Sequence, residues 1–97
     1  MEIKETATAG TLESSDIQLI LSSGTGNIEI DLESDVKKQF GTQIESVITD
    51  TLNQMNITSA KVKAVDKGAL DCVIKARTIA VAQRATGTVG EPAWEVL

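Results

Sequence analysis

Residues 28–56 read IEIDLESDVKKQFGTQIESVITDTLNQMN, and the spacing of their apolar residues changes halfway. Up to Leu32 every second residue is apolar, which is the period of a half-buried strand. From there on, apolar residues recur at the three- and four-residue spacing of an amphipathic helix. These residues are Val36, Phe40, Ile44, Val47, Ile48, Leu52 and Met55. The stretch predicts a strand over 28–33 and a long helix that begins at Ser34, a good capping residue, and closes at Asn56, which tolerates the left-handed conformation past a helix end.

A second alternating run precedes this stretch. Residues 17–22, IQLILS, place apolar side chains on one face of an extended chain. Residues 22–27, SSGTGN, contain two glycines and are typical of a turn. We therefore expect the two runs on either side of this turn to pair as a β-hairpin.

The segment after the long helix contains two further alternating runs. Residues 60–65, AKVKAV, predict a third strand, and residues 66–69, DKGA, predict a turn. Residues 70–75, LDCVIK, predict a fourth strand and a second hairpin, with Cys72 on the inward face. The alanine-rich residues 76–85 predict a short helix.

Together these segments predict a single α+β domain with the element order ββαββα in a chain of 97 residues. The sheet is expected to be mostly antiparallel, with the helices packed on one face. Residues 1–85 would form the domain, including an N-terminal segment over 1–15, and residues 86–97 a flexible tail. Trp94 in this tail is expected either to fold back onto the sheet or to anchor in a partner.

The composition limits the chemistry that the chain can perform by itself. The formal net charge is −5 and the basic residues are spread out, which disfavours nucleic-acid binding. With no histidine and one cysteine, Cys72, the chain lacks the base of a serine triad and the usual metal ligands. No apolar run approaches the roughly 20 residues that span a membrane, and Met1–Glu5 lacks the features of a signal peptide. We therefore expect a cytoplasmic protein that is not an enzyme by itself and binds no metal, nucleic acid or membrane.

Residues 10–16, GTLESSD, form a short polar segment with two adjacent serines and two carboxylates. Serines in such a segment cap helices, form turns or carry a covalent modification. From residue types alone, a turn that leads into the following strand is the favoured interpretation.

The order Gly-Thr-Leu-Glu-Ser-x-Asp in this segment resembles the acyl carrier protein (gamma subunit) family of citrate lyase. Residues 65–72, VDKGALDC, followed by Ile74-Lys75-Ala76-Arg77, match the same family. A third block over 45–52, preceded by KQFG at 38–41, lies at the family's usual position. The resemblance covers essentially the whole chain, and its specificity comes from the combination of the three blocks.

The resemblance implies a covalent attachment site at Ser14. In the family this serine carries 2′-(5″-phosphoribosyl)-3′-dephospho-coenzyme A through a phosphodiester, and Ser15 is a second, weaker candidate. Glu13 and Asp16 would be local context for the prosthetic-group transferase. The thiol arm of this phosphoprotein would hold acetyl and citryl thioesters in citrate fermentation. The partners implied are the citrate lyase alpha subunit, an acyl transferase, and the beta subunit, a citryl-thioester lyase, which together cleave citrate to acetate and oxaloacetate.

The sequence also leaves alternative functions open. Fatty-acid acyl carrier proteins are helical bundles with an Asp-Ser-Leu motif at a helix start, whereas this chain has Glu-Ser-Ser-Asp before a predicted strand, so a shared function would rest on a different fold. A small interaction or regulatory module without a prosthetic group, binding through a sheet edge or Trp94, is the alternative. A free-standing enzyme is disfavoured by the missing catalytic side chains. A covalent mass increment on Ser14 separates the first two hypotheses.

Overall fold

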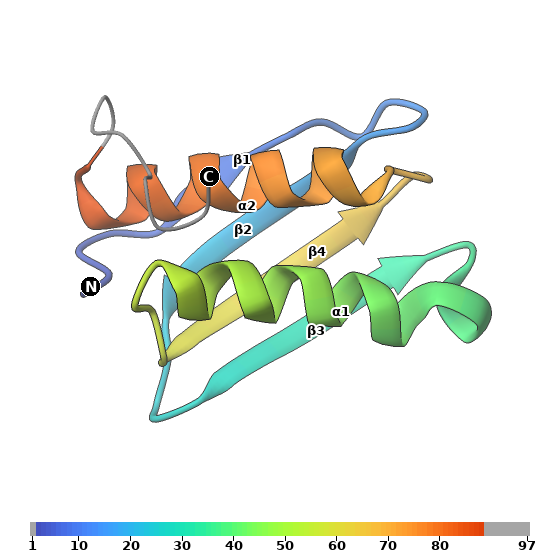
Figure 1. Cartoon of the computed structure of the whole chain (residues 1–97). Helices are drawn as coiled ribbons and strands as arrows, with labels where there is room; N and C mark the ends of the chain where they lie inside the picture. The colour runs from blue at the N-terminus through green and yellow to red at the C-terminus, as the bar shows by residue number, and fades with distance from the viewer. Residues whose placement is uncertain (1, 89–97) are drawn as a thin grey trace.

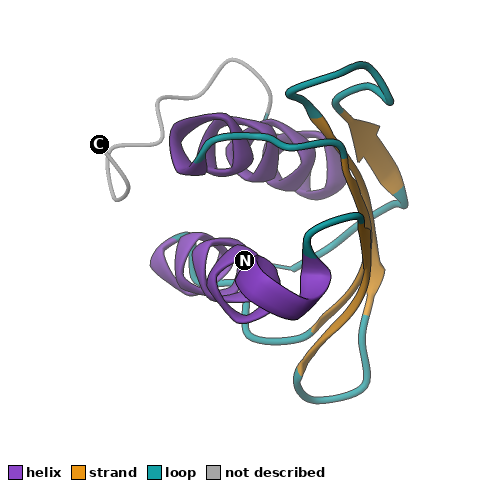
Figure 2. Cartoon of the chain, turned by 90° about the vertical axis from the view of Figure 1, so that its right-hand side faces the viewer, coloured by secondary structure: helices purple, strands orange, loops and turns teal. Residues whose placement is uncertain are grey.

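Within the described part of the chain, two helices lie on one face of a four-stranded sheet (Figures 1 and 2). The computed structural model describes residues 2–88. In chain order its elements are β1 (Ala7–Ala9), β2 (Ile17–Ser23), β3 (Ile28–Ser34), α1 (Lys37–Gln54), β4 (Ala60–Asp66) and α2 (Asp71–Thr86). Helix α2 packs over β1 and β2, and α1 packs over β3. The predicted α+β class, with the helices on one face, is confirmed.

The strands lie in the order β1-β2-β4-β3. Strand β2 is antiparallel to β1 and to β4, whereas β3 is parallel to β4. Two of the three pairings are thus antiparallel, as predicted. The predicted hairpin between β2 and β3 is wrong, because β4 lies between these strands and pairs with both.

The loop between β2 and β3 crosses the first residue of β4 (Figure 1). Gly26 N–H donates to Ser59 Oγ (2.9 Å), and Ala60 N–H donates to the Asn27 carbonyl (3.1 Å). A Cβ at Gly24 would lie 2.4 Å from the backbone nitrogen of Ala60, so this crossing needs a glycine. The glycine-rich segment is therefore a turn, as predicted, but it carries the chain over a third strand.

The predicted fourth strand over 70–75 is also wrong. Helix α2 begins at Asp71, and the Leu70 carbonyl accepts the N–H groups of Val73 and Ile74. The alternation of this segment is only six residues long, and Leu70 and Ile74 also have helical spacing, so the segment continues the helical residues that follow it. Cys72, expected on an inward strand face, is exposed on this helix.

The fourth strand is instead β1, which makes the observed order βββαβα rather than ββαββα. Its three residues are too few to produce a detectable period, and they lie in the N-terminal segment over 1–15, for which no strand was predicted. Two neighbouring elements hold strand β1 in place. It pairs with β2, and Arg84 Nη1 of α2 donates to the Thr8 carbonyl (2.6 Å). Over residues 2–88 there are four strands and two helices, the numbers that were predicted.

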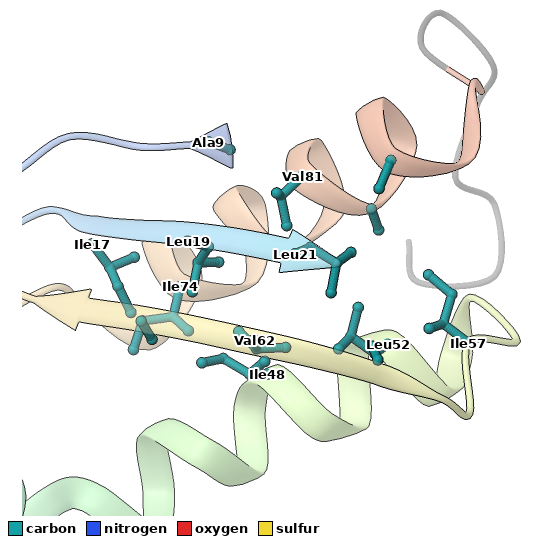
Figure 3. Packing of buried hydrophobic residues seen from close by; sticks show 14 of the residues in the cluster. Ala9, Ile17, Leu19, Leu21, Ile48, Leu52, Ile57, Val62, Ile74 and Val81 are labelled. Carbon is teal, nitrogen blue, oxygen red and sulfur yellow. The ribbon is translucent and has the colours of Figure 1, made fainter. Parts of the chain in front are cut away.

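The core lies between the sheet and the helices (Figure 3). Ile17, Leu19 and Leu21 of β2 have no exposed surface, and they face buried residues of both helices. These helix residues include Ile48, Leu52, Ile74 and Val81. Burial of this apolar surface is the main source of stability, at roughly 25 cal/mol per Å² removed from water.

The predicted apolar stripe of α1 is buried only in its later part. Ile44, Ile48, Leu52 and Met55 are buried, whereas Phe40 is 51% exposed. The helix also begins three residues later than predicted, at Lys37, while Asn56 beyond its end has the expected left-handed backbone (φ +62°). The first turns of α1 therefore extend past the core. Residues 89–97, which include most of the predicted tail and Trp94, lie outside the described residues.

Candidate attachment site

The loop between β1 and β2 presents Ser14 at the tip of a turn. The Asp16 N–H donates to the Glu13 carbonyl (3.2 Å) and closes this turn around the two serines. Both serines are exposed. Within residues 2–88 no group of the chain forms a hydrogen bond with the Ser14 hydroxyl. The hydroxyl is therefore accessible to a reagent from solvent.

The backbone on the C-terminal side of Ser14 is anchored to the loop between β4 and α2. The Ser15 N–H donates to the Lys67 carbonyl (2.8 Å), and the Lys67 N–H donates to the Asp16 carbonyl (2.9 Å). These bonds extend the antiparallel ladder of β2 and β4 beyond its last pair, Ile17 and Asp66. Ser15 has a φ of +66°, which is uncommon for a residue other than glycine. The serine turn is thus held in one conformation from one side.

Gly10 closes the other side of the loop. Its φ is +87°, and a Cβ at this position would lie 1.8 Å from the Ile17 carbonyl oxygen. Any other residue would collide with the backbone of β2, because the loop folds back tightly onto the start of that strand. A glycine is therefore a geometric requirement of the loop.

Asp16 ties the loop to helix α2. Arg77 forms a bidentate ion pair with it, since Nε lies 3.0 Å from Oδ1 and Nη2 lies 3.0 Å from Oδ2. Thr11 Oγ1 donates to Oδ2 (2.7 Å), and the Ile17 N–H donates to Oδ1 (2.7 Å). The carboxylate accepts four hydrogen bonds while only 9% of the residue is exposed.

These contacts stabilise the charged form of the Asp16 carboxyl. The hydrogen bonds from Arg77 and then from Thr11 lower the pKa of Asp16 far below its usual range, although partial burial opposes the change. The same pairing raises the pKa of Arg77. Because its oxygens are engaged within the chain, Asp16 shapes the loop, whereas the Glu13 side chain is exposed.

Arg77 lies in one of the sequence blocks that match the family, but its pairing with Asp16 was not predicted. The two residues are 61 positions apart, and no local pattern reports such a contact. Arg77 belongs to α2, which spans the residues that were predicted as a strand over 70–75 and a short helix over 76–85. Two signals could have indicated this pair: a correct assignment of residues 71–86 as a helix, and the scarcity of arginine in the chain.

A second engaged carboxylate, Asp66, holds the neighbouring loop. It is 2% exposed, and its Oδ2 accepts from Ser34 Oγ (2.9 Å) while Oδ1 accepts from the Ala69 N–H (3.0 Å). Ser34 Oγ in turn accepts the Val36 N–H (3.2 Å). The end of β3, the start of α1 and the loop after β4 are thereby joined beside the serine turn.

The described residues contain no group of three or more side chains suited to hold a metal ion. Over the same range no helix is long and apolar enough to cross a membrane. Every buried side-chain nitrogen or oxygen between residues 2 and 88 has a hydrogen-bond partner.

Comparison with known proteins identifies the family and the fold. The family model ACP, described as malonate decarboxylase delta subunit (MdcD), matches residues 4–85. In the solved structures, the chain is similar to one in the crystal structure of a Pseudomonas malonate decarboxylase hetero-tetramer in complex with malonate. The TM-score is 0.68, the identity is 16%, and 84% of each chain is covered. At this identity the likeness shows the fold alone.

Curated relatives match the whole chain. The citrate lyase acyl carrier protein of Lactiplantibacillus plantarum is 71% identical over 97 residues, with both chains covered completely. The proteins of the same name from Lactobacillus helveticus and Oenococcus oeni are 69% and 68% identical over the same length. From its first residue to its last, the chain therefore belongs to the family of citrate lyase acyl carrier proteins.

Proposed function

We propose that this chain is the acyl carrier subunit of citrate lyase and that Ser14 is the attachment point of its prosthetic arm. The observation that carries the proposal is the exposed Ser14 hydroxyl on a turn whose two sides are anchored by Gly10 and by the Asp16–Arg77 ion pair. A transferase needs a serine oxygen that it can reach, in a position that does not vary. The names and complete coverage of the relatives support the carrier role.

The group proposed for Ser14 is 2′-(5″-phosphoribosyl)-3′-dephospho-coenzyme A, joined through a phosphodiester. When attached, the group supplies a thiol that carries acyl groups as thioesters. Ser14 fits this attachment because its hydroxyl is exposed and has no hydrogen-bond partner within residues 2–88. Ser14 Oγ would form the ester to phosphate, and the rest of the chain would hold that oxygen in place.

The chain would perform no bond chemistry by itself. The proposed partners are the alpha subunit as acyl transferase, the beta subunit as lyase and a separate prosthetic-group transferase, all in the cytoplasm. With these partners the complex would cleave citrate to acetate and oxaloacetate. An exposed thiol arm on a small body suits movement between two partner active sites.

Peptide mass spectrometry on protein isolated from citrate-fermenting cells tests the proposal. We expect a phosphate-containing adduct on the peptide that holds Ser14. Ser14→Ala should abolish both the adduct and the citrate lyase activity of the reconstituted complex. Ser15→Gly is the matched control, since glycine accepts the positive φ at this position, and it should retain both. An unmodified wild-type chain from such cells, or an adduct retained by Ser14→Ala, would overturn the proposal.

A further inference from the structure

A groove opens between the start of α1 and the loop that leads from β4 into α2. Its volume is about 450 Å³. Val36 and Phe40 line it from the α1 side, and Ala69 and Leu70 line it from the loop. We call it the Phe40 groove. A groove of this size is in the usual range for small-molecule sites.

The walls of the groove expose apolar surface that the fold does not use. Phe40 is 51% exposed and Leu70 is 70% exposed. Leu12 is the other large apolar side chain that is strongly exposed among residues 2–88, and it lies over the helix-free face of the sheet with Ile20 and Val65. Two neighbouring exposed anchors in one concave site are typical of a binding surface.

The groove adjoins the serine turn. The Ser15 N–H lies 2.8 Å from the Lys67 carbonyl oxygen, and the next residue, Gly68, lines the groove. Standard backbone dimensions then place the Cα atoms of Ser14 and Gly68 within about 8 Å of each other. Figure 1 shows both loops at the end of the molecule where α1 and α2 begin. A group attached to Ser14 through a phosphate and two riboses reaches on the order of 10 Å, which is far enough to enter the groove.

The polar atoms of the groove favour an uncharged planar ligand. Asp66 and Asp71 line it, so phosphate groups are repelled. The Gln43 amide donates to one oxygen of Asp71 (2.8 Å), which leaves the Gln43 oxygen, its second N–H and the other Asp71 oxygen available. A glutamine amide is complementary to the amino group and N7 of adenine, and a phenyl face stacks on the base.

We propose that the Phe40 groove binds the adenine base of the arm on Ser14 while the carrier is between partners. This inference rests on the proposed function. Phe40 stacks on the base, Gln43 and Asp71 bind its edge, and the phosphates stay outside near Lys67. Because the ligand is tethered, its effective concentration at the groove is on the order of millimolar, so a weak site is occupied and still releases the arm.

The test is nuclear magnetic resonance on isotope-labelled carrier with the arm attached, after mass spectrometry has verified the adduct. We expect cross-relaxation between adenine ring protons and the Phe40 ring, and changed amide shifts at Gln43 and Leu70 relative to the unmodified chain. Phe40→Ala should reduce the amide shift changes at Gln43 and Leu70 by roughly fivefold or more, because loss of a stacking partner weakens binding of the base. Gln43→Glu, which adds charge and removes the amide, is a second variant on an exposed position and should weaken them also.

Leu12→Ala is the matched control, because it removes an equally exposed apolar side chain from the other face and should leave the signals unchanged. A modified carrier whose adenine protons contact no groove residue overturns this inference while the carrier function stands. Groove shifts that arise only when a partner subunit is added also overturn it and show a protein-docking surface. An unmodified Ser14 in native protein overturns the proposed function and the groove ligand together.

Discussion

Asp16 at the start of β2 and Arg77 on α2 form a two-point ion pair, with both nitrogen–oxygen distances 3.0 Å. The pair joins the serine loop to a helix 61 residues further along the chain. Its carboxylate is nearly buried, whereas 41% of the Arg77 side chain is exposed. The position of Ser14 relative to the body therefore depends on a contact between residues that are distant in sequence.

Asp16→Asn should lower the free energy of unfolding by about 1–3 kcal/mol, because the hydrogen bonds to a charged acceptor are weakened and Arg77 loses its counter-charge. Urea unfolding followed by circular dichroism measures the change. Glu13→Gln removes an exposed carboxylate from the same loop and should change stability by less than about 0.5 kcal/mol. Equal effects of the two substitutions would contradict the role assigned to the pair.

The stability that Asp16 contributes should be lost in acid. Its pKa in the folded chain is lowered by Arg77 and Thr11, so the contribution is fully present above the unfolded pKa of about 3.9 and declines as the pH falls from there toward the folded pKa. The difference in unfolding free energy between wild type and Asp16→Asn should shrink between pH 6 and about pH 2.5. Other carboxylates are common to both proteins and cancel. A difference that stays constant with pH would contradict the prediction.

Gly10→Ala should destabilise the loop strongly, because the new Cβ would lie 1.8 Å from the Ile17 carbonyl oxygen. We expect a loss of more than about 3 kcal/mol, or failure to fold. Gly26→Ala is the control: its φ is also positive (+115°), but no atom lies within 4 Å of the added Cβ. It should lose only about 1–2 kcal/mol, from backbone conformation. Similar losses at both positions would show that collision with β2 is not the determining factor.

Ser34→Ala should remove two contacts at the junction beside the serine turn, the bond to Asp66 (2.9 Å) and the one from the Val36 N–H (3.2 Å). Because Asp66 is buried, we expect a loss of about 1–2 kcal/mol in thermal or urea unfolding. Ser46→Ala provides the comparison, since its hydroxyl makes a single long, exposed contact with Asp50 (3.4 Å). A smaller effect at Ser34 than at Ser46 would contradict this account.

The extent to which the fold was predictable follows from the length of each pattern. The periodic pattern of apolar residues is long enough to predict both the element type and its buried face in four cases: helix α1 and strands β2, β3 and β4. Over 70–75 the apolar positions fit both a strand and a helix, and the helix prevails because its buried face continues through Thr78 and Val81 into the core. The three residues of β1 have no period at all.

The candidate site shows the same division. Ser14 was identified by motif, and its assignment as attachment point stays a prediction. The Asp16–Arg77 pair and the Phe40 groove were not predicted. Phe40 has the helical spacing of a core residue, and only the position of α1 relative to the end of the sheet leaves it exposed.

The amino-acid sequence by itself determined helix α1, strands β2, β3 and β4, most of their buried faces, and the family. These properties depend on the order of neighbouring residues, which periodicity and motifs report directly. The tertiary structure alone decided that β4 lies between β2 and β3, that Arg77 reaches Asp16 and that the serine turn adjoins a groove. Backbone hydrogen bonds are alike for every strand pair, so the choice of partner depends on how all the buried faces pack together at once.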